Sequence, residues 1–378
     1  MTTRNTLMRV GNAFFATCAT NGSTTQVQKG NVAVQSMVPN IATTPTDARR
    51  HWSEGWQELR KLEDGVHKIG ICSLRGNTLQ PDVYRPLLQK AFAQKIIGQD
   101  QYKRMMYTLR YGADLFIDQD ALALLPDRIF RRNYPSAYEN SEAVTKAILA
   151  RVRSGKTLKL GYFRRSEFPE LPVKQVICFP MGAVVKPHDP TEYRPFGDHT
   201  KSLLNEAGRP WSHSLKALDE LKRKLTRNKF MRMSDIDGAF TILPLVPWLW
   251  TYMLFMWFDV EAPLHGQAVA DTLYVHLFAD FGTVGCPLEW FEFFSVTLDL
   301  ARMECVLRSD LVLYVDDLSH IGDDDAALDL EGGELECFLD KCGVPTKHPK
   351  TRRAARLQIS LGLWWNTTNF TLWLVEEK

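Results

Sequence analysis

Two adjacent aspartates interrupt an apolar stretch late in the sequence, and this feature restricts the fold of the chain most. The stretch Leu311 to Gly322 reads LVLYVDDLSHIG, with a hydrophobic residue on each side of Asp316 and Asp317. Adjacent carboxylates repel each other, and a strand is a poor place to keep them. We expect LVLYV and LSHIG to form two strands of a tight hairpin with both carboxylates at its tip.

Clustered carboxylates are commonly neutralised by a divalent cation, and Mg²⁺ prefers a few carboxylates together with phosphate oxygens. On the pair alone, a solvated acidic turn is the alternative. The run Asp323 to Asp325 in the same chain is an example, because it indicates the acidic start of a helix.

A third carboxylate extends the hypothesis. The segment MSDIDGAFTILPL places Asp235 among apolar residues, with Phe240 five positions later. An aspartate on a strand beside the hairpin tip would complete a two-metal site for an in-line displacement. Asp237 is a rival on the same strand face, and the spacing to Phe240 favours Asp235. With strand alternation, we expect Asp316 to face Asp235 and Asp317 to point partly away.

Three motifs in order resemble those of reverse transcriptases. LVLYVDD is similar to their Tyr-x-Asp-Asp hairpin, and DIDGAF followed by LPL is similar to their first palm motif. FGTVGCPLEW, with Gly282, Pro287 and Trp290, resembles the motif between these two. Asp235 and Asp316 are 81 positions apart, and the order of the motifs is that of the family.

The resemblance implies an enzyme, an RNA-directed DNA polymerase that transfers nucleotides with two Mg²⁺ ions, or Mn²⁺ in their place. Asp235, Asp316 and Asp317 would be both the catalytic residues and the metal ligands. The implied nucleotide-binding residues are Lys186, Arg194, Phe240, Gly282, Pro287 and Lys347. The implied primer grip is the segment LGLWWN, with Leu361, Gly362 and Trp364.

Individual roles follow from the same resemblance. The segment VVKPHDPTEYRPFGDHTKSLLNEAG is similar to the fingers, with Lys186 and Arg194 on the triphosphate and Asp198 and Asn205 supporting them. An aromatic residue at Phe240 would lie under the sugar and exclude a 2′-hydroxyl. CGVPTKHPK resembles the palm segment whose lysine, here Lys347, approaches the leaving pyrophosphate.

The expected fold class is α+β, a right-hand polymerase with an antiparallel palm sheet packed on helices and with the thumb largely missing. The expected segments are a disordered leader 1–46, a helical N-terminal region 47–155, fingers 156–230, palm 231–358 and a primer-grip hairpin 359–378. The resemblance covers about residue 133 to the C-terminus. NYPSAYENSEAVTKAILARVRSG also resembles the lead-in to the polymerase of tyrosine-recombinase (DIRS-like) retrotransposons.

Local patterns predict several elements. Residues 52–65 read as a helix with Gly65 as its cap, and residues 86–112 read as two amphipathic helices. We expect a helix at 141–155 with Ser141 as a cap candidate, and a C-terminal hairpin that turns at residues 366–369.

Charge and cysteine content bear on nucleic-acid binding and on the cellular compartment. The 378 residues carry a net charge of +2, so any nucleic-acid site must come from local basic runs. Residues 221–233 and 347–356 are the densest runs, and each is either a phosphate-binding surface or a solvated face. Seven unevenly scattered cysteines favour a reducing compartment, and we expect an intracellular protein of the cytoplasm or nucleus. Residues 1–46 contain no acid, so a targeting segment is the alternative to a disordered leader.

The segment 239–260 is long and apolar enough to raise the question of a membrane helix. Pro244, Pro247 and flanking aspartates favour two buried strands joined by a turn, and we expect no membrane association. The implied partners are an RNA or DNA template, a DNA primer and dNTPs. RNase H and recombinase domains would lie elsewhere in a longer polyprotein.

Two positions depart from the family. Phe281 stands where a polar residue, often Gln, is usual, and Cys286 stands where Ser or Ala is common. Both lie near the expected base pair, so a degenerate or domesticated copy that binds nucleic acid without synthesis is one alternative. An RNA virus polymerase is another, but Tyr-Val before the aspartates and Phe240 argue against it.

Overall fold

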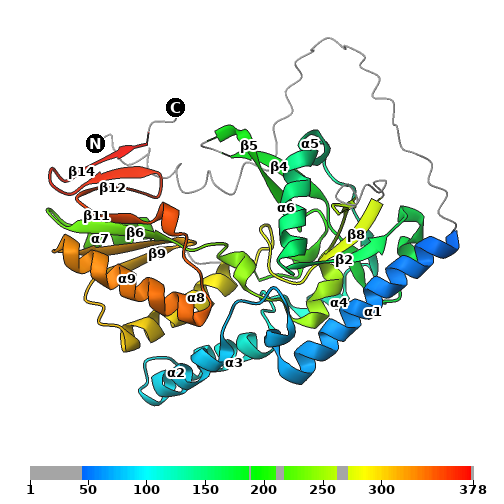
Figure 1. Ribbon diagram of the computed structural model, residues 1–378, viewed down its shortest axis with the longest axis horizontal. Helices are drawn as coiled ribbons and strands as arrows, with labels where there is room; N and C mark the ends of the chain where they lie inside the picture. The colour runs from blue at the N-terminus through cyan, green and yellow to red at the C-terminus, as the bar shows by residue number, and fades with distance from the viewer. Residues whose placement is uncertain (1–44, 187–188, 210–216, 262–270, 376–378) are drawn as a thin grey trace, which may run out of the picture. The chain divides into compact units, whose positions relative to one another are not determined.

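A computed structural model of the chain describes residues 45–186, 189–209, 217–261 and 271–375. All of them belong to one compact unit, residues 42–378. The expected leader, 1–46, lies outside the described residues except for its last two positions. Helices combined with several separate sheets confirm the α+β class (Figure 1).

Helices dominate the first part of the described chain. The two helices expected within residues 86–112 are confirmed, whereas α1 passes through Gly65 and ends before Gly70, which has a φ of +88°. Gly65 is a packing position, because a Cβ there would lie 3.1 Å from the Cβ of Ser73. The elements are α1 (Pro45–Ile69), η1 (Ile71–Ser73), α2 (Pro81–Ala93), α3 (Gln99–Tyr111), α4 (Gln119–Ala123), α5 (Pro135–Glu139) and α6 (Ser141–Arg153).

A five-stranded sheet has the order β1-β3-β7-β8-β2 and joins parts of the chain that the sequence assigned to three segments. Its strands are β1 (Arg128–Phe130), β2 (Thr157–Tyr162), β3 (Val176–Cys178), β7 (Leu254–Phe258) and β8 (Asp271–His276). The expected segment boundaries at 155/156 and 230/231 therefore fall between strands of one sheet.

The apolar segment 239–260 forms one strand, β7, and not the expected two. Short 3₁₀ turns, η4 (Phe240–Ile242) and η5 (Pro247–Tyr252), precede it. Pro244 and Pro247 lack the amide hydrogen that a strand ladder needs, which explains the difference. No helix within the described residues has the length and apolar character needed to cross a membrane.

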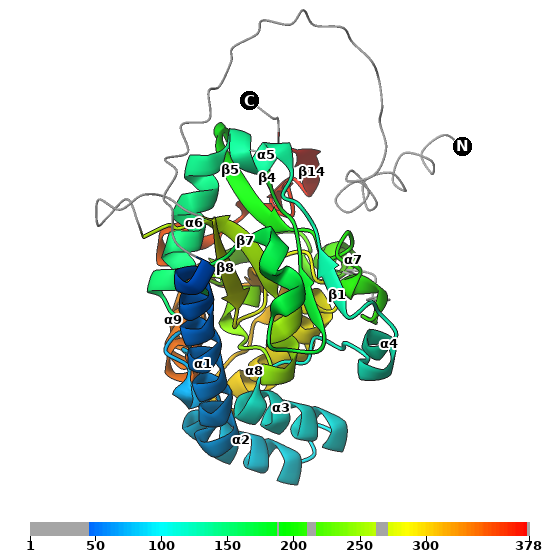
Figure 2. The same cartoon turned by 90° about the vertical axis from the view of Figure 1, so that its right-hand side faces the viewer.

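A two-stranded hairpin of β4 (Met181–Lys186) and β5 (Asp189–Gly197) lies beside α5 and α6 (Figure 2). Along the chain, η2 (Arg165–Glu170) precedes β3. The elements η3 (Leu204–Glu206) and α7 (Ala217–Lys224) follow β5.

The four-stranded sheet that carries the aspartates has the order β11-β6-β10-β9. Its strands are β6 (Phe230–Asp235), β9 (Asp310–Tyr314), β10 (Asp317–Gly322) and β11 (Arg352–Ala355). Helix α9 (Asp325–Cys342) covers it through contacts with three of the strands, and α8 (Cys286–Glu304) packs against α9 (Figure 1).

The C-terminal residues form a three-stranded sheet in the order β12-β13-β14. Its strands are β12 (Leu357–Ser360), β13 (Leu363–Asn366) and β14 (Thr371–Leu374), so the turn expected near residues 366–369 is confirmed and β12 adds a third strand. Trp365 is buried in a cluster with Met231 and Met233 of β6, which ties this sheet to the four-stranded one.

Candidate active site

The predicted hairpin is present. Tyr314 of β9 pairs with Asp317 of β10, so Val315 and Asp316 form a two-residue loop. Val315 has a φ of +56°, an uncommon value for a β-branched residue. The buried indole of Trp290 on α8 donates a hydrogen bond of 2.6 Å to the carbonyl oxygen of Val315 and holds this conformation.

Strand β6 brings the third aspartate to the same end of the sheet. Asp317 stands directly opposite Asp235 in the antiparallel ladder, and the amide of Ile236 donates a 2.9 Å bond to the carbonyl of Asp316. Directly opposed residues place their side chains on the same face. The expectation that Asp317 points partly away from Asp235 is therefore wrong.

The electrostatics of the hairpin tip reflect three neighbouring acids, here called the carboxylate cluster (Asp235, Asp316 and Asp317). Burial raises the pKa of Asp317 to about 6, and the carboxylates of Asp316 and Asp235 add to the effect. Burial also raises the pKa of Asp316, with Asp235 acting in the same direction. Each additional negative charge makes ionisation of its neighbours harder, so the cluster has a high affinity for positive charge.

A lysine that was not predicted as a site residue supplies part of this charge. The ammonium of Lys350 lies 2.8 Å from Oδ2 of Asp235, and this bond raises the pKa of the lysine. Lys350 ends η7 (His348–Lys350), just before β11. Its only sequence signal is membership of the basic run 347–356, which does not separate it from the cations around it.

The donor set suits a hard divalent cation, because carboxylate oxygens are the ligands that Mg²⁺ prefers. Lys350 shows that the cluster accepts a cation, since its ammonium already contacts Asp235. Within the part of the chain that the structure describes, no three acidic, histidine or cysteine side chains are arranged to hold one metal ion together.

Asp237, the rival of Asp235, lies beyond the end of β6. Its amide bonds to the carbonyl of Pro345, and its carboxylate is 3.7 Å from the ammonium of Lys347. Lys347 thus contacts the cluster only through its backbone, which donates a 2.7 Å bond to the carbonyl oxygen of Asp235.

Phe240, Phe281 and Arg194 are neighbours of one another, and Arg194 links this group to the cluster through its charge. Phe240 is buried, and its ring centroid is 5.1 Å from that of Phe281, which is 41% exposed. The guanidinium carbon of Arg194 is 6.0 Å from the centroid of the Phe281 ring. Burial raises the pKa of Asp316 overall, and the positive charge of Arg194 on β5 partly offsets this rise, so this charge reaches the carboxylate cluster.

Lys186, the second cation predicted to bind the triphosphate, does not lie at the carboxylate cluster. Lys186, at the end of β4, forms an ion pair with Glu192 across the hairpin. The structure gives it no contact with the three aspartates.

Gly282 lies in the loop before α8, where this loop meets the end of β5. It has a φ of +107°, and a Cβ there would lie 2.3 Å from the carbonyl oxygen of Gly197. Asn205 fixes this loop, because its side chain donates to the carbonyl of Gly282 at 2.9 Å and accepts from the amide of Val284 at 2.8 Å. Pro287 follows in the first turn of α8.

The predicted primer-grip residues belong to the three-stranded sheet. Leu361 and Gly362 form the loop between β12 and β13, with φ values of +55° and +72°. Trp364 stacks on Trp373 of β14 at a centroid distance of 6.2 Å. Packing of the sheet explains this tryptophan without a ligand.

The two basic runs differ. In the run 221–233, several cations are already paired with carboxylates or lie in the core, namely Arg223, Lys224, Lys229 and Arg232. The run 347–356 contains the exposed Arg352 and Arg353 on β11. The second run is therefore the better candidate for contacts with phosphates.

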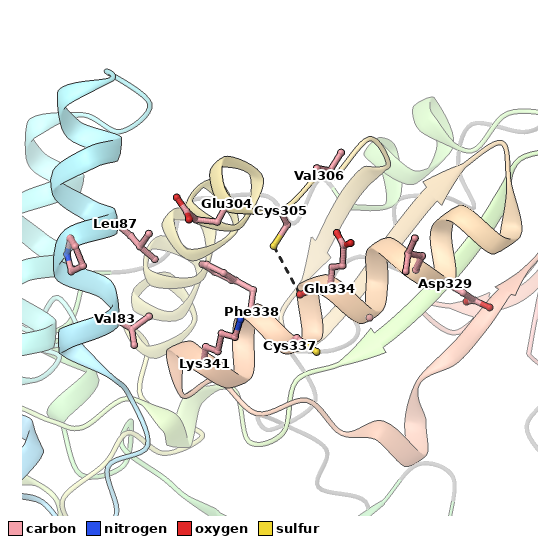
Figure 3. A pocket seen from close by; sticks show the side chains of 13 residues that line it. Val83, Leu87, Glu304, Cys305, Val306, Asp329, Glu334, Cys337, Phe338 and Lys341 are labelled. Carbon is pink, nitrogen blue, oxygen red and sulfur yellow. Dashed lines mark hydrogen bonds between the residues drawn. The ribbon is translucent and has the colours of Figure 1, made fainter.

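A hollow of about 950 Å³ lies between α2, the end of α8 and α9, and no residue of the carboxylate cluster lines it. Figure 3 shows Val83 and Leu87 of α2 facing Phe338 and Lys341 of α9. This hollow is separate from the candidate active site.

Comparison of the chain with protein-family models gives no match, and comparison with curated proteins gives none either.

Proposed function

We propose that the chain is the fingers and palm part of a reverse transcriptase, an RNA-directed DNA polymerase of a retroelement, with a tyrosine-recombinase (DIRS-like) element as its source. The observation that carries this proposal is the meeting of Asp235, Asp316 and Asp317 at one end of the sheet β11-β6-β10-β9. This sheet with α8 and α9 would be the palm, and the β4–β5 hairpin would belong to the fingers.

The residues around the cluster suit nucleotidyl transfer. When bound, two Mg²⁺ or Mn²⁺ ions held by the three aspartates would activate a 3′-hydroxyl and neutralise a leaving pyrophosphate. Arg194 brings a fixed positive charge to the fingers side of the cluster, which suits a triphosphate. Phe240, five residues after Asp235, packs against Phe281, and we expect its ring to exclude a 2′-hydroxyl.

The test is primer extension on poly-rA with dNTPs and Mg²⁺ or Mn²⁺. We expect synthesis by the wild-type chain and its loss in Asp316→Asn. Asp310→Asn is the matched control, because Asp310 lies at the open end of the same hairpin in an exposed ion pair with Lys224. Synthesis that survives Asp316→Asn would refute the catalytic assignment.

Nucleotide choice separates this proposal from its rivals. Phe240→Ala should increase incorporation of rNTPs relative to dNTPs, because it empties the volume beside the sugar. A wild-type preference for rNTPs would favour an RNA virus polymerase. Retained binding of a template–primer duplex without synthesis would favour a degenerate copy.

A further inference from the structure

A second pocket, of about 410 Å³, lies where three distant segments of the chain meet next to Pro345. It is lined by the loop that follows η1, by the turn after α6 and by the segment that follows β6. Arg75, Lys156, Asp237 and Thr241 supply its main polar groups. Asp237 is two residues from Asp235, so the pocket adjoins the carboxylate cluster without including any of its members.

Close backbone contacts hold the walls of this pocket in place. A Cβ on Gly76 would lie 2.8 Å from the carbonyl carbon of Gly155, and a Cβ on Gly343 would lie 1.9 Å from the carbonyl oxygen of Thr78. The amide of Gln80 also bonds to the carbonyl at the end of α9 at 3.1 Å. The loop that carries Arg75 is therefore fixed on both sides, and its shape is built into the fold.

The charges in the pocket are not balanced. The ammonium of Lys156 is partly buried, and its hydrogen bond is a long one, 3.4 Å, to the hydroxyl of Thr241. Among the described residues no carboxylate forms an ion pair with Lys156 or with Arg75. Burial lowers the pKa of Lys156 and the nearby Arg151 lowers it further, while the negative charge of Asp237 acts in the opposite direction.

One acid faces the pocket and has another partner. The carboxylate of Asp237 lies 3.7 Å from the ammonium of Lys347, and Arg151 is paired with Asp280 at 3.2 Å. Lys156 and the exposed Arg75 thus line the hollow with no carboxylate at ion-pair distance among the described residues, and Asp237 acts on Lys156 only from farther away. An anion with several oxygens would contact both cations, whereas the hydroxyl of Thr241 already donates a 2.9 Å bond to the carbonyl of Gly238.

We propose that this pocket binds a phosphate group, with Lys156 and Arg75 as its cationic partners. Two sources of phosphate are compatible with the location, and both rest on the proposed function. One is the pyrophosphate released at the carboxylate cluster, and the other is a backbone phosphate of the template–primer duplex. Phosphate binding by the pocket does not depend on the proposed function, because it follows from the charges and the fixed walls of the pocket.

Binding of inorganic pyrophosphate to the full chain, measured by calorimetry without divalent cations, tests the first source. We expect wild type and Arg153→Gln to bind, and Lys156→Gln to bind about tenfold more weakly. Arg153 is the matched control, because it is exposed, lies three residues from Lys156 and does not line the pocket. Asp237→Asn should bind more tightly, since it removes the one negative charge that faces the ligand.

Binding of a labelled RNA–DNA duplex at several salt concentrations tests the second source. If the ligand is a backbone phosphate, Lys156→Gln should weaken duplex binding and reduce the salt slope by about one, while pyrophosphate does not bind. Unchanged binding of both ligands in Lys156→Gln, with a normal melting temperature, would overturn the proposal. Weaker pyrophosphate binding in Asp237→Asn would overturn it as well.

A variant of the carboxylate cluster separates this proposal from the polymerase assignment. Asp316→Asn should lose synthesis and keep Lys156-dependent phosphate binding. If the wild-type chain binds phosphate through Lys156 but synthesises no DNA, the pocket stands and the proposed function fails. If it synthesises DNA but Lys156→Gln alters no phosphate binding, the proposed function stands and the pocket fails.

Discussion

Replacement of Asp317 by Asn should make the folded chain more stable at neutral pH. The folded chain holds the pKa of Asp317 at about 6, against 3.8 for an ordinary aspartate, first because of burial and then because of Asp316 and Asp235. Between these two values the folded state binds more protons than the unfolded state. Stability therefore falls as the pH rises through this window, and it is greatest below it.

The difference between the two pKa values sets an upper limit of about 3 kcal/mol on this loss. The side chain is only partly buried, and solvent screening reduces the expected effect to about 1–2 kcal/mol. Asp317→Asn removes the charge, so the free energy of unfolding of the variant should exceed that of wild type by this amount at about pH 7.5. The gap should close at about pH 4, where the carboxyl is protonated in wild type as well.

Urea denaturation at both pH values, with a chelator present, measures the two free energies of unfolding. Asp310→Asn is the control, and this exposed replacement should change stability little at either pH. Adding Mg²⁺ at neutral pH should stabilise wild type more than Asp317→Asn, because only wild type keeps all three carboxylates. A variant less stable than wild type at neutral pH, or a gap that does not depend on pH, would refute the reasoning.

Three further changes test other parts of the fold. Lys350→Gln removes the ammonium 2.8 Å from Asp235 and should lower stability by about 1 kcal/mol or less without divalent ions. The variant should need a lower Mg²⁺ concentration than wild type for the same rise in melting temperature, because no lysine competes with the ion. Gly343→Ala places a Cβ 1.9 Å from the carbonyl oxygen of Thr78 at a φ of +80° and should cost about 2–4 kcal/mol in urea denaturation, and an unchanged midpoint would argue against this contact. Arg232→Met removes the 2.8 Å ion pair of the buried Glu336 and should cost about 3 kcal/mol by the same measurement, and a neutral result would mean that its bonds from Ser234 and Thr351 suffice.

The parts of the site that were predicted from sequence depend on local patterns. An apolar run that ends in two aspartates and resumes after them indicates a hairpin, and the ladder of β9 and β10 follows that pattern. The spacing from Asp235 to Phe240 favoured Asp235 over Asp237, and β6 ends at Asp235, opposite the hairpin. Strand alternation gave the wrong direction for Asp317, because it assumes one continuous strand. Val315 and Asp316 form the loop, so Asp317 begins a new strand opposite Asp235.

The parts that were missed depend on contacts between distant segments. Lys350 reaches Asp235 only because a 3₁₀ turn folds back before β11, and no spacing in the sequence announces this. The bond from Trp290 to the hairpin loop likewise joins a helix to a turn 25 positions away. In the apolar segment 239–260, hydrophobicity suggested a second strand, but the backbone chemistry of two prolines decided the outcome.

The position of β6 in the middle of its sheet has a consequence for synthesis on the ribosome. Asp235 can meet the hairpin aspartates as soon as β10 is complete, whereas Lys350 and β11 are made later. At about 5–20 residues per second, the lysine follows Asp317 by roughly 2–7 s. During this interval the three acids lack their lysine, and the sources of neutralising charge are Arg194, which is made earlier, and a proton or a divalent cation from the surrounding solution.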